Sequence, residues 1–107
     1  MAWAFLGIAG LCEIAFTVAL KYAAGFTRMW PSLAFIAAYA ASAWFLSLAI
    51  RTIPVGTAYA VWTGIGAVGA AGLGIWLFAE PATAARLAFI ALIVIGVAGL
   101  KLVSSAA

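Results

Sequence analysis

Long apolar stretches alternate along the chain with short segments that carry most of the charged residues and prolines. Two stretches contain no charged side chain, and the first contains only Glu13. A helix needs about 20 mainly apolar residues to cross a bilayer, which these stretches provide. The last stretch is shorter, but Arg86 and Lys101 at its ends can extend their charged groups to the membrane surface. The pattern predicts membrane-spanning helices at about residues 2–21, 29–50, 54–78 and 83–103.

The connections between these helices are short and contain residues that end or start helices. These residues are Gly25, Pro31, Pro54 and Pro81. Helices joined so closely run up and down, which places both ends of the chain on one side of the membrane. A β-barrel is disfavoured because the apolar runs are continuous rather than alternating. We therefore expect an all-α integral membrane protein with residues 1–107 in a single membrane domain.

The composition agrees with this fold class and excludes several functions. Of the 107 residues, 70% are hydrophobic and 7% are charged, whereas soluble domains are typically about 45–50% apolar and about 25% charged. The five basic residues are spread along the chain, which argues against nucleic-acid binding. One cysteine and no histidine leave no usual ligand set for a metal. We expect no metal, no other cofactor and no enzyme, because a lone carboxylate lacks a nucleophile and base beside it.

The basic residues also predict how the chain inserts into the membrane. Loops rich in Lys and Arg favour the cytoplasm, so their distribution sets the orientation. Lys21, Arg28 and Arg86 lie on one side, and Arg51, Lys101 and the terminal amine lie on the other. This nearly equal split predicts insertion in both orientations, so the chain can pair with itself as an antiparallel dual-topology homodimer. Four helices of this length also enclose too little space for a polar pathway, which favours an oligomer.

Glu13 is the one charged residue that the pattern places inside the bilayer. An ionised side chain at that depth costs about 2.5–3.5 kcal/mol on insertion scales, and such residues commonly mark ion or proton pathways. No basic residue lies at a comparable depth, so a counter-ion has to come from outside the chain. We predict that Glu13 binds either a proton or a small organic cation, which produces exchange across the lipid bilayer. The alternative is a structural carboxylic acid that stays protonated or hydrogen-bonded.

The third predicted helix offers side chains that can line a site around Glu13. Tyr59, Trp62, Thr63 and Gly66 follow the i, i+3, i+4, i+7 spacing of one helical face. A desolvated cation stacked on Trp62 gains about 2 kcal/mol, and the Tyr59 hydroxyl can donate a hydrogen bond to Glu13. The alternative is that these aromatic residues anchor the helix at the membrane surface.

The first two predicted helices supply further candidates. The face of Glu13 includes Gly10, Phe16 and Thr17. Gly10 leaves room for a ligand or, alternatively, allows close helix packing. Ser42 is a hydroxyl within the second helix, which can bond a carboxylate or a carbonyl one turn earlier.

Glycines in the last two predicted helices are candidates for bending and packing. Gly64 and Gly66 allow the third helix to bend while the site reorients. Gly96 marks a seam at which the fourth helices of two chains can approach closely. Close packing within one chain is the competing interpretation, because small residues mark contacts without identifying the partner.

Several motifs occur in a characteristic order along the chain. Glu13 is followed by Lys21-Tyr22, then by Gly25-Phe26-Thr27-Arg28, then by residues 54–66 and the ending at residues 95–101. This combination resembles the small multidrug resistance transporters. The resemblance implies a dual-topology dimer in the bacterial inner membrane that exports cations in exchange for protons, both bound at the glutamate. Residues 62–69 are similar to the guanidinium exporter subtype, which implies a binding site of Glu13, Ser42, Tyr59 and Trp62.

One position departs from the guanidinium exporter pattern. Such exporters carry Trp three residues after the glutamate, whereas this chain has Phe16, which keeps an aromatic ring but lacks the indole donor. A pocket with fewer hydrogen bonds can accept substituted guanidiniums or quaternary ammonium compounds, so a broad multidrug exporter is the first alternative. A heterodimer with a related chain and a non-transporting membrane assembly subunit are the others.

Overall fold

The computed structural model describes residues 1–104, which form four α-helices. Each helix has between 21 and 23 residues and is long and apolar enough to cross a membrane. The helices are α1 (Ala2–Ala23), α2 (Met29–Ala49), α3 (Val55–Leu77) and α4 (Ala84–Ser104). The prediction of an all-α chain with four apolar helices is confirmed.

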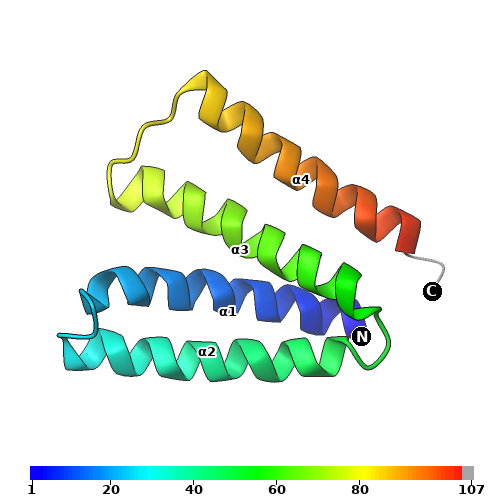
Figure 1. The fold of residues 1–107 in the computed structure, drawn as a ribbon, viewed down its shortest axis with the longest axis horizontal. Coiled ribbons are helices and arrows are strands. Elements are labelled where there is room, and N and C mark those ends of the chain that lie inside the picture. The colour runs from blue at the N-terminus through cyan, green and yellow to red at the C-terminus, as the bar shows by residue number, and fades with distance from the viewer. Residues whose placement is uncertain (105–107) are drawn as a thin grey trace.

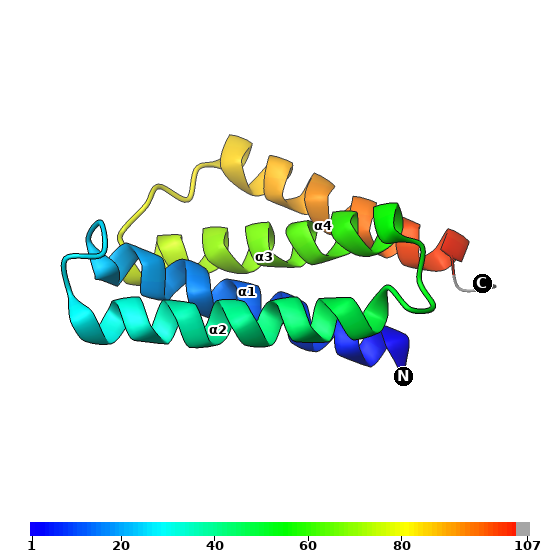
Figure 2. The ribbon, with the colours of Figure 1, turned by 60° about the horizontal axis from the view of Figure 1, so that its bottom comes forward.

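The helices run up and down in an open row rather than in a closed bundle (Figure 1). α1 lies between α2 and α3, and α3 lies between α1 and α4. The start of α1, the end of α4 and the α2–α3 loop share one end of the molecule, as a turned view also shows (Figure 2). This order follows from connections that are too short for a helix to return to its starting side.

Local backbone chemistry sets where the helices end and start. After α1, Ala24, Gly25 and Phe26 have φ values of 48°, 72° and 64°, so three successive left-handed residues reverse the chain. Before α4, the Thr83 hydroxyl accepts a hydrogen bond from the Arg86 N–H at 3.2 Å. Such a cap satisfies one of the N–H groups that the first turn of a helix leaves free.

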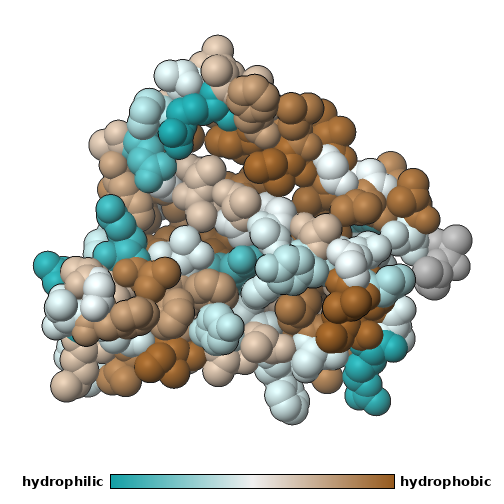
Figure 3. Space-filling model, in the orientation of Figure 1, coloured by the Kyte–Doolittle hydropathy of each residue, from teal (hydrophilic) through white to brown (hydrophobic). Residues whose placement is uncertain are grey.

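The buried core lies where the first half of α1 meets the end of α2 and the start of α3. Its residues are Leu6, Ala49, Ile53, Ala58 and Val61. α4 contributes no buried residue, and its side chains include Phe89 at 66% and Ile95 at 64% exposure. In the space-filling view, α4 accordingly presents a broad hydrophobic surface (Figure 3). Such a surface suits contact with lipid or with another membrane helix.

Candidate functional site

Glu13 lies near the middle of α1 and points at α3. Its carboxylate rests against the backbone of Gly66, where a Cβ atom would overlap the carboxylate carbon and Oε1. A side chain at position 66 would therefore displace the acid. Gly66, which the sequence analysis predicts to bend α3, thus has a steric role beside Glu13.

The Glu13 carboxylate lacks a counter-ion among residues 1–104. Its Oε1 atom is buried and has no hydrogen-bond partner among the described residues. The described part of the chain contains one ion pair, which joins Arg86 to Glu80 at 3.3 Å and does not involve Glu13. Leaving a buried polar group unpaired costs about 1–3 kcal/mol, and more when it is charged. An acid in this position can be neutralised by a proton or by a cation from outside.

Two successive hydrogen bonds join α3, α2 and α1 one helical turn from Glu13. Trp62 Nε1 donates to Ser42 Oγ at 2.9 Å, and Ser42 Oγ donates to the Ala9 carbonyl at 2.7 Å. Ser42 is fully buried, so its bond to Ala9 is buried and its bond from the half-buried Trp62 is partly buried. Ser42 therefore bonds neither the carboxylate nor a carbonyl of its own helix, because α1 presents the Ala9 carbonyl to it.

Tyr59 and Thr63 lie at the edge of this arrangement. The Tyr59 ring packs against the Trp62 ring with centroids 5.5 Å apart, and the residue is 57% exposed. The expected hydrogen bond from Tyr59 to Glu13 is not formed in the described structure, where the tyrosine ring contacts Trp62 and is largely exposed. Thr63 is also exposed. The helical face expected to surround Glu13 is therefore only partly directed at it.

Phe16 and Thr17 follow Glu13 on α1 and make contacts away from the carboxylate. The Phe16 ring packs against Phe35 and Tyr39 of α2, with centroids 5.6 and 5.3 Å apart. The Thr17 hydroxyl donates to the Glu13 carbonyl oxygen at 2.8 Å, so it bonds the backbone of its own helix. An aromatic surface between α1 and α2 therefore lies beside the helix turn that carries the acid.

The candidate glycines occupy different environments. Gly10 faces Ile65 of α3 and Gly64 faces Val97 of α4, each so closely that a Cβ atom would clash. For Gly10, the structure supports close helix packing rather than space for a ligand. Gly96 has no neighbour within 4 Å of the position that a Cβ atom would take. Its side of α4 is therefore free of contacts with the described residues.

Two features of this region have no clear signal in the sequence. The Ala9 carbonyl is a backbone group that any residue type provides, and only the packing of α2 on α1 reveals its role. The second feature is a cavity of about 390 Å³ that Trp3 and Lys101 line together. These residues lie at opposite ends of the sequence, so their proximity depends on how α4 packs.

A sequence model of the family described as Small Multidrug Resistance protein matches residues 1–93. The chain belongs to the small multidrug resistance family. A guanidinium exporter of Citrobacter freundii is 59% identical over 95% of this chain and 97% of its own length. One of Yersinia pestis is 53% identical over 97% of this chain and 100% of its own length.

Membership of the small multidrug resistance family confirms the resemblance drawn from the motifs. It makes the chain a transport protein rather than an enzyme, and a multi-pass protein of the bacterial inner membrane. A third guanidinium exporter, from Salmonella typhimurium, is 56% identical over 95% of the chain. The similarity therefore covers all four helices rather than one motif.

Proposed function

We propose that the protein exports guanidinium-type small cations in exchange for protons, with Glu13 as the shared site. The observation that carries this proposal is the buried Glu13 Oε1, which has no hydrogen-bond partner among the described residues. The names of the relatives, all guanidinium exporters, support the substrate class. Export of small cations is what the family and these relatives support in common.

The exchange mechanism follows from charge balance at one carboxylate. A proton and a cation cannot both neutralise Glu13, so binding of one favours release of the other. Cation release on one side and proton release on the other require the site to face each side in turn. Symmetric repeats around a site near the bilayer midplane are a known route to such alternating access.

The neighbouring residues have separate proposed roles. Ser42 holds the Trp62 indole through the 2.9 Å hydrogen bond, and the Trp62 and Tyr59 rings offer aromatic surface to a cation. Phe16, Thr17 and Thr63 are proposed to line the margin of this site. Gly10 is proposed to let Ile65 pack closely beside it. We assign the bending and packing of the helices to Gly64, Gly66 and Gly96.

The proposed assembly is an antiparallel dual-topology homodimer. The exposed surface of α4, with Gly96 free of contacts, supports a seam between two copies. Two chains of opposite orientation would place two Glu13 side chains in one chamber. The nearly even distribution of basic residues supports insertion in both orientations.

A broad quaternary ammonium exporter is the second candidate. The observation that favours it is the ring contact of Phe16 with Phe35 and Tyr39, because this surface offers apolar and aromatic area without an indole donor. A guanidinium needs in-plane acceptors, whereas a quaternary ammonium has no hydrogen to donate. The two candidates therefore differ in the substrate and share the site.

The test is substrate-driven proton flux with the full chain in proteoliposomes. A guanidinium gradient should move protons, and Glu13→Gln should abolish the flux while the protein still folds. Glu80→Gln is the matched control, because it makes the same change at the other acidic residue, outside the helices. Exchange that survives Glu13→Gln would contradict the mechanism.

The same assay separates the alternatives. Proton flux driven by a tetraalkylammonium but not by guanidinium would replace the first substrate class with the second. A folded protein that exchanges neither cation would instead support the non-transporting assembly subunit. Activity that requires a related second chain would support a heterodimer.

A further inference from the structure

An apolar groove runs between α1, α3 and α4, away from the Ser42–Trp62 hydrogen bond. It consists of two adjoining cavities of about 390 and about 370 Å³. The cavities share Ile65, Val97 and Ala98 in their linings, so they adjoin where α4 crosses α3. The inner cavity reaches Ile14 and Val94 and is lined only by apolar residues and glycines. The inner part of the groove is thus apolar, whereas its outer end includes the polar side chains of Lys101 and Trp3.

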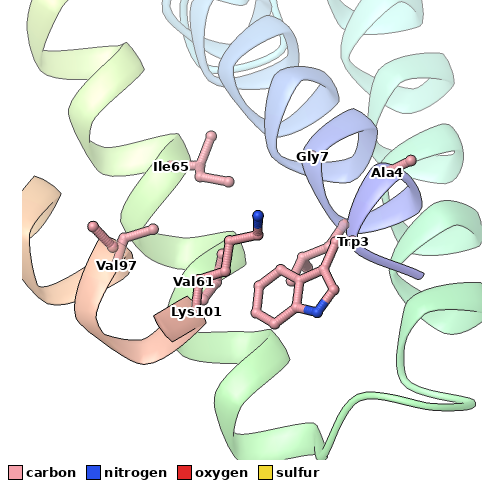
Figure 4. Close-up of a pocket in the computed structure, with 9 residues that line it drawn as sticks. Trp3, Ala4, Gly7, Val61, Ile65, Val97 and Lys101 are labelled. Atoms are coloured by element: carbon pink, nitrogen blue, oxygen red, sulfur yellow. The ribbon is translucent and has the colours of Figure 1, made fainter. Parts of the chain in front are cut away.

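The outer end of the groove carries a cation and an indole. Lys101 Nζ lies 5.7 Å from the centre of the Trp3 ring, and the close-up shows the lysine extending from α4 across the cavity toward α1 (Figure 4). Within residues 1–104, no carboxylate forms an ion pair with Lys101. The positive charge is therefore not balanced by a described group at the mouth of the groove.

This end of the groove is suited to the membrane surface. Lys101 lies in the last turn of α4 and Trp3 in the first turn of α1. Lys and Trp side chains concentrate where the hydrocarbon core meets the lipid headgroups. Basic pockets between membrane helices bind the headgroups of anionic lipids. A positive mouth with an apolar floor matches both parts of such a lipid.

The groove and the proposed dimer seam lie on different faces of α4. Successive residues turn by about 100° around a helix, so Val94, Val97, Ala98 and Lys101 share one face. Gly96 lies on roughly the opposite face by the same geometry. A second copy packed at Gly96 would therefore leave the groove open to the bilayer.

We propose that this groove binds one anionic glycerophospholipid. Its phosphate would lie at Lys101 beside Trp3, and an acyl chain would lie along Ile65, Val97 and Ala98. Charge complementarity selects an anionic lipid over a zwitterionic one of equal chain length. The proposal is independent of the transport mechanism, because it concerns neither Glu13 nor the exchanged cation.

Native mass spectrometry of the full-length protein tests the headgroup. The probes are phosphatidylglycerol and phosphatidylcholine with identical acyl chains, and the wild type should retain phosphatidylglycerol preferentially. Lys101→Gln should reduce that preference about fivefold, the effect of one basic side chain at a membrane surface. Lys101→Arg should keep it. Arg51→Gln is the matched control, because Arg51 is a basic residue at the same end of the molecule and outside both cavities.

A second variant tests the apolar floor. Ala98→Phe narrows the groove where its cavities join and should reduce retention of both lipids without lowering the dimer fraction. The proposal is overturned if Lys101→Gln keeps the wild-type preference or if Arg51→Gln removes it equally. A fall in the dimer fraction with unchanged lipid retention would instead identify a second copy of the chain as the occupant.

Discussion

At the scale of single residues, the position of Glu13 depends on what α3 places opposite it. Gly66 supplies bare backbone, so the carboxylate can approach α3 closely. One turn away, the Trp62–Ser42–Ala9 hydrogen bonds fix three helices relative to one another. The acid therefore has a steric constraint at Gly66 and a polar network one turn away, and each can be removed separately.

Gly66→Ala tests the steric constraint. The added methyl group would overlap the Glu13 carboxylate, which is the flexible end of its side chain and would have to rotate away from Gly66. A displaced acid should bind the cation less well, so cation affinity should fall by about fivefold, equivalent to about 1 kcal/mol. Titration of guanidinium-driven proton flux measures it. Gly72→Ala, also on α3 but with open space around it, should behave like the wild type, and equal losses in both variants would contradict the steric role.

Ser42→Ala tests the polar constraint. It removes the acceptor of the Trp62 N–H and the donor to the Ala9 carbonyl, and the unpaired buried groups should cost about 1–3 kcal/mol of stability. Thermal unfolding and tryptophan fluorescence in detergent report the loss. Ser47→Ala is the control, since Ser47 is an exposed serine of the same helix that bonds only its own backbone. Indistinguishable melting of the two variants would show that the network is unimportant.

At the scale of elements, the sequence predicts much of the fold and less of the site. Bilayer length and the absence of charge locate the helices, because an apolar run in lipid has to satisfy its backbone within itself. The Trp62–Ser42 bond depends instead on how the helices rotate and pair, which periodicity does not determine. Tyr59 shows the difference: its spacing from Trp62 is helical, yet it forms no hydrogen bond to Glu13 in the described structure and is largely exposed.

Gly96→Ile tests the proposed role of α4 as a seam. A branched side chain would keep two copies of α4 apart, so the dimer fraction should fall several-fold, while the helix content of each chain is retained. Crosslinking in membranes measures the dimer. Ala91→Ile makes a similar change on the same exposed helix, roughly 140° around it from Gly96. A dimer that tolerates Gly96→Ile but not Ala91→Ile would place the seam on another face.

At the scale of the whole molecule, the open row of helices fits the proposal that two chains assemble into one transporter. α4 buries no residue, and an exterior this apolar needs lipid or a second copy around it. The five basic residues lie near both ends of the row, so neither end marks the cytoplasmic side strongly. The proposed antiparallel pair would need both orientations in equal number, which this near balance favours.

Two charge-balanced variants test the antiparallel pair. Arg51→Ser with Thr27→Arg moves a positive charge to the end of the molecule that carries the α1–α2 loop. Arg28→Ser with Thr52→Arg moves one to the opposite end. Both variants keep the wild-type net charge of +3. Each variant should insert in one orientation, which reporters fused to the C-terminus measure. Alone, each should transport poorly because it lacks an inverted partner, and co-expression should restore export. Full activity from either variant alone, with a single orientation established, would mean that the working assembly is not antiparallel.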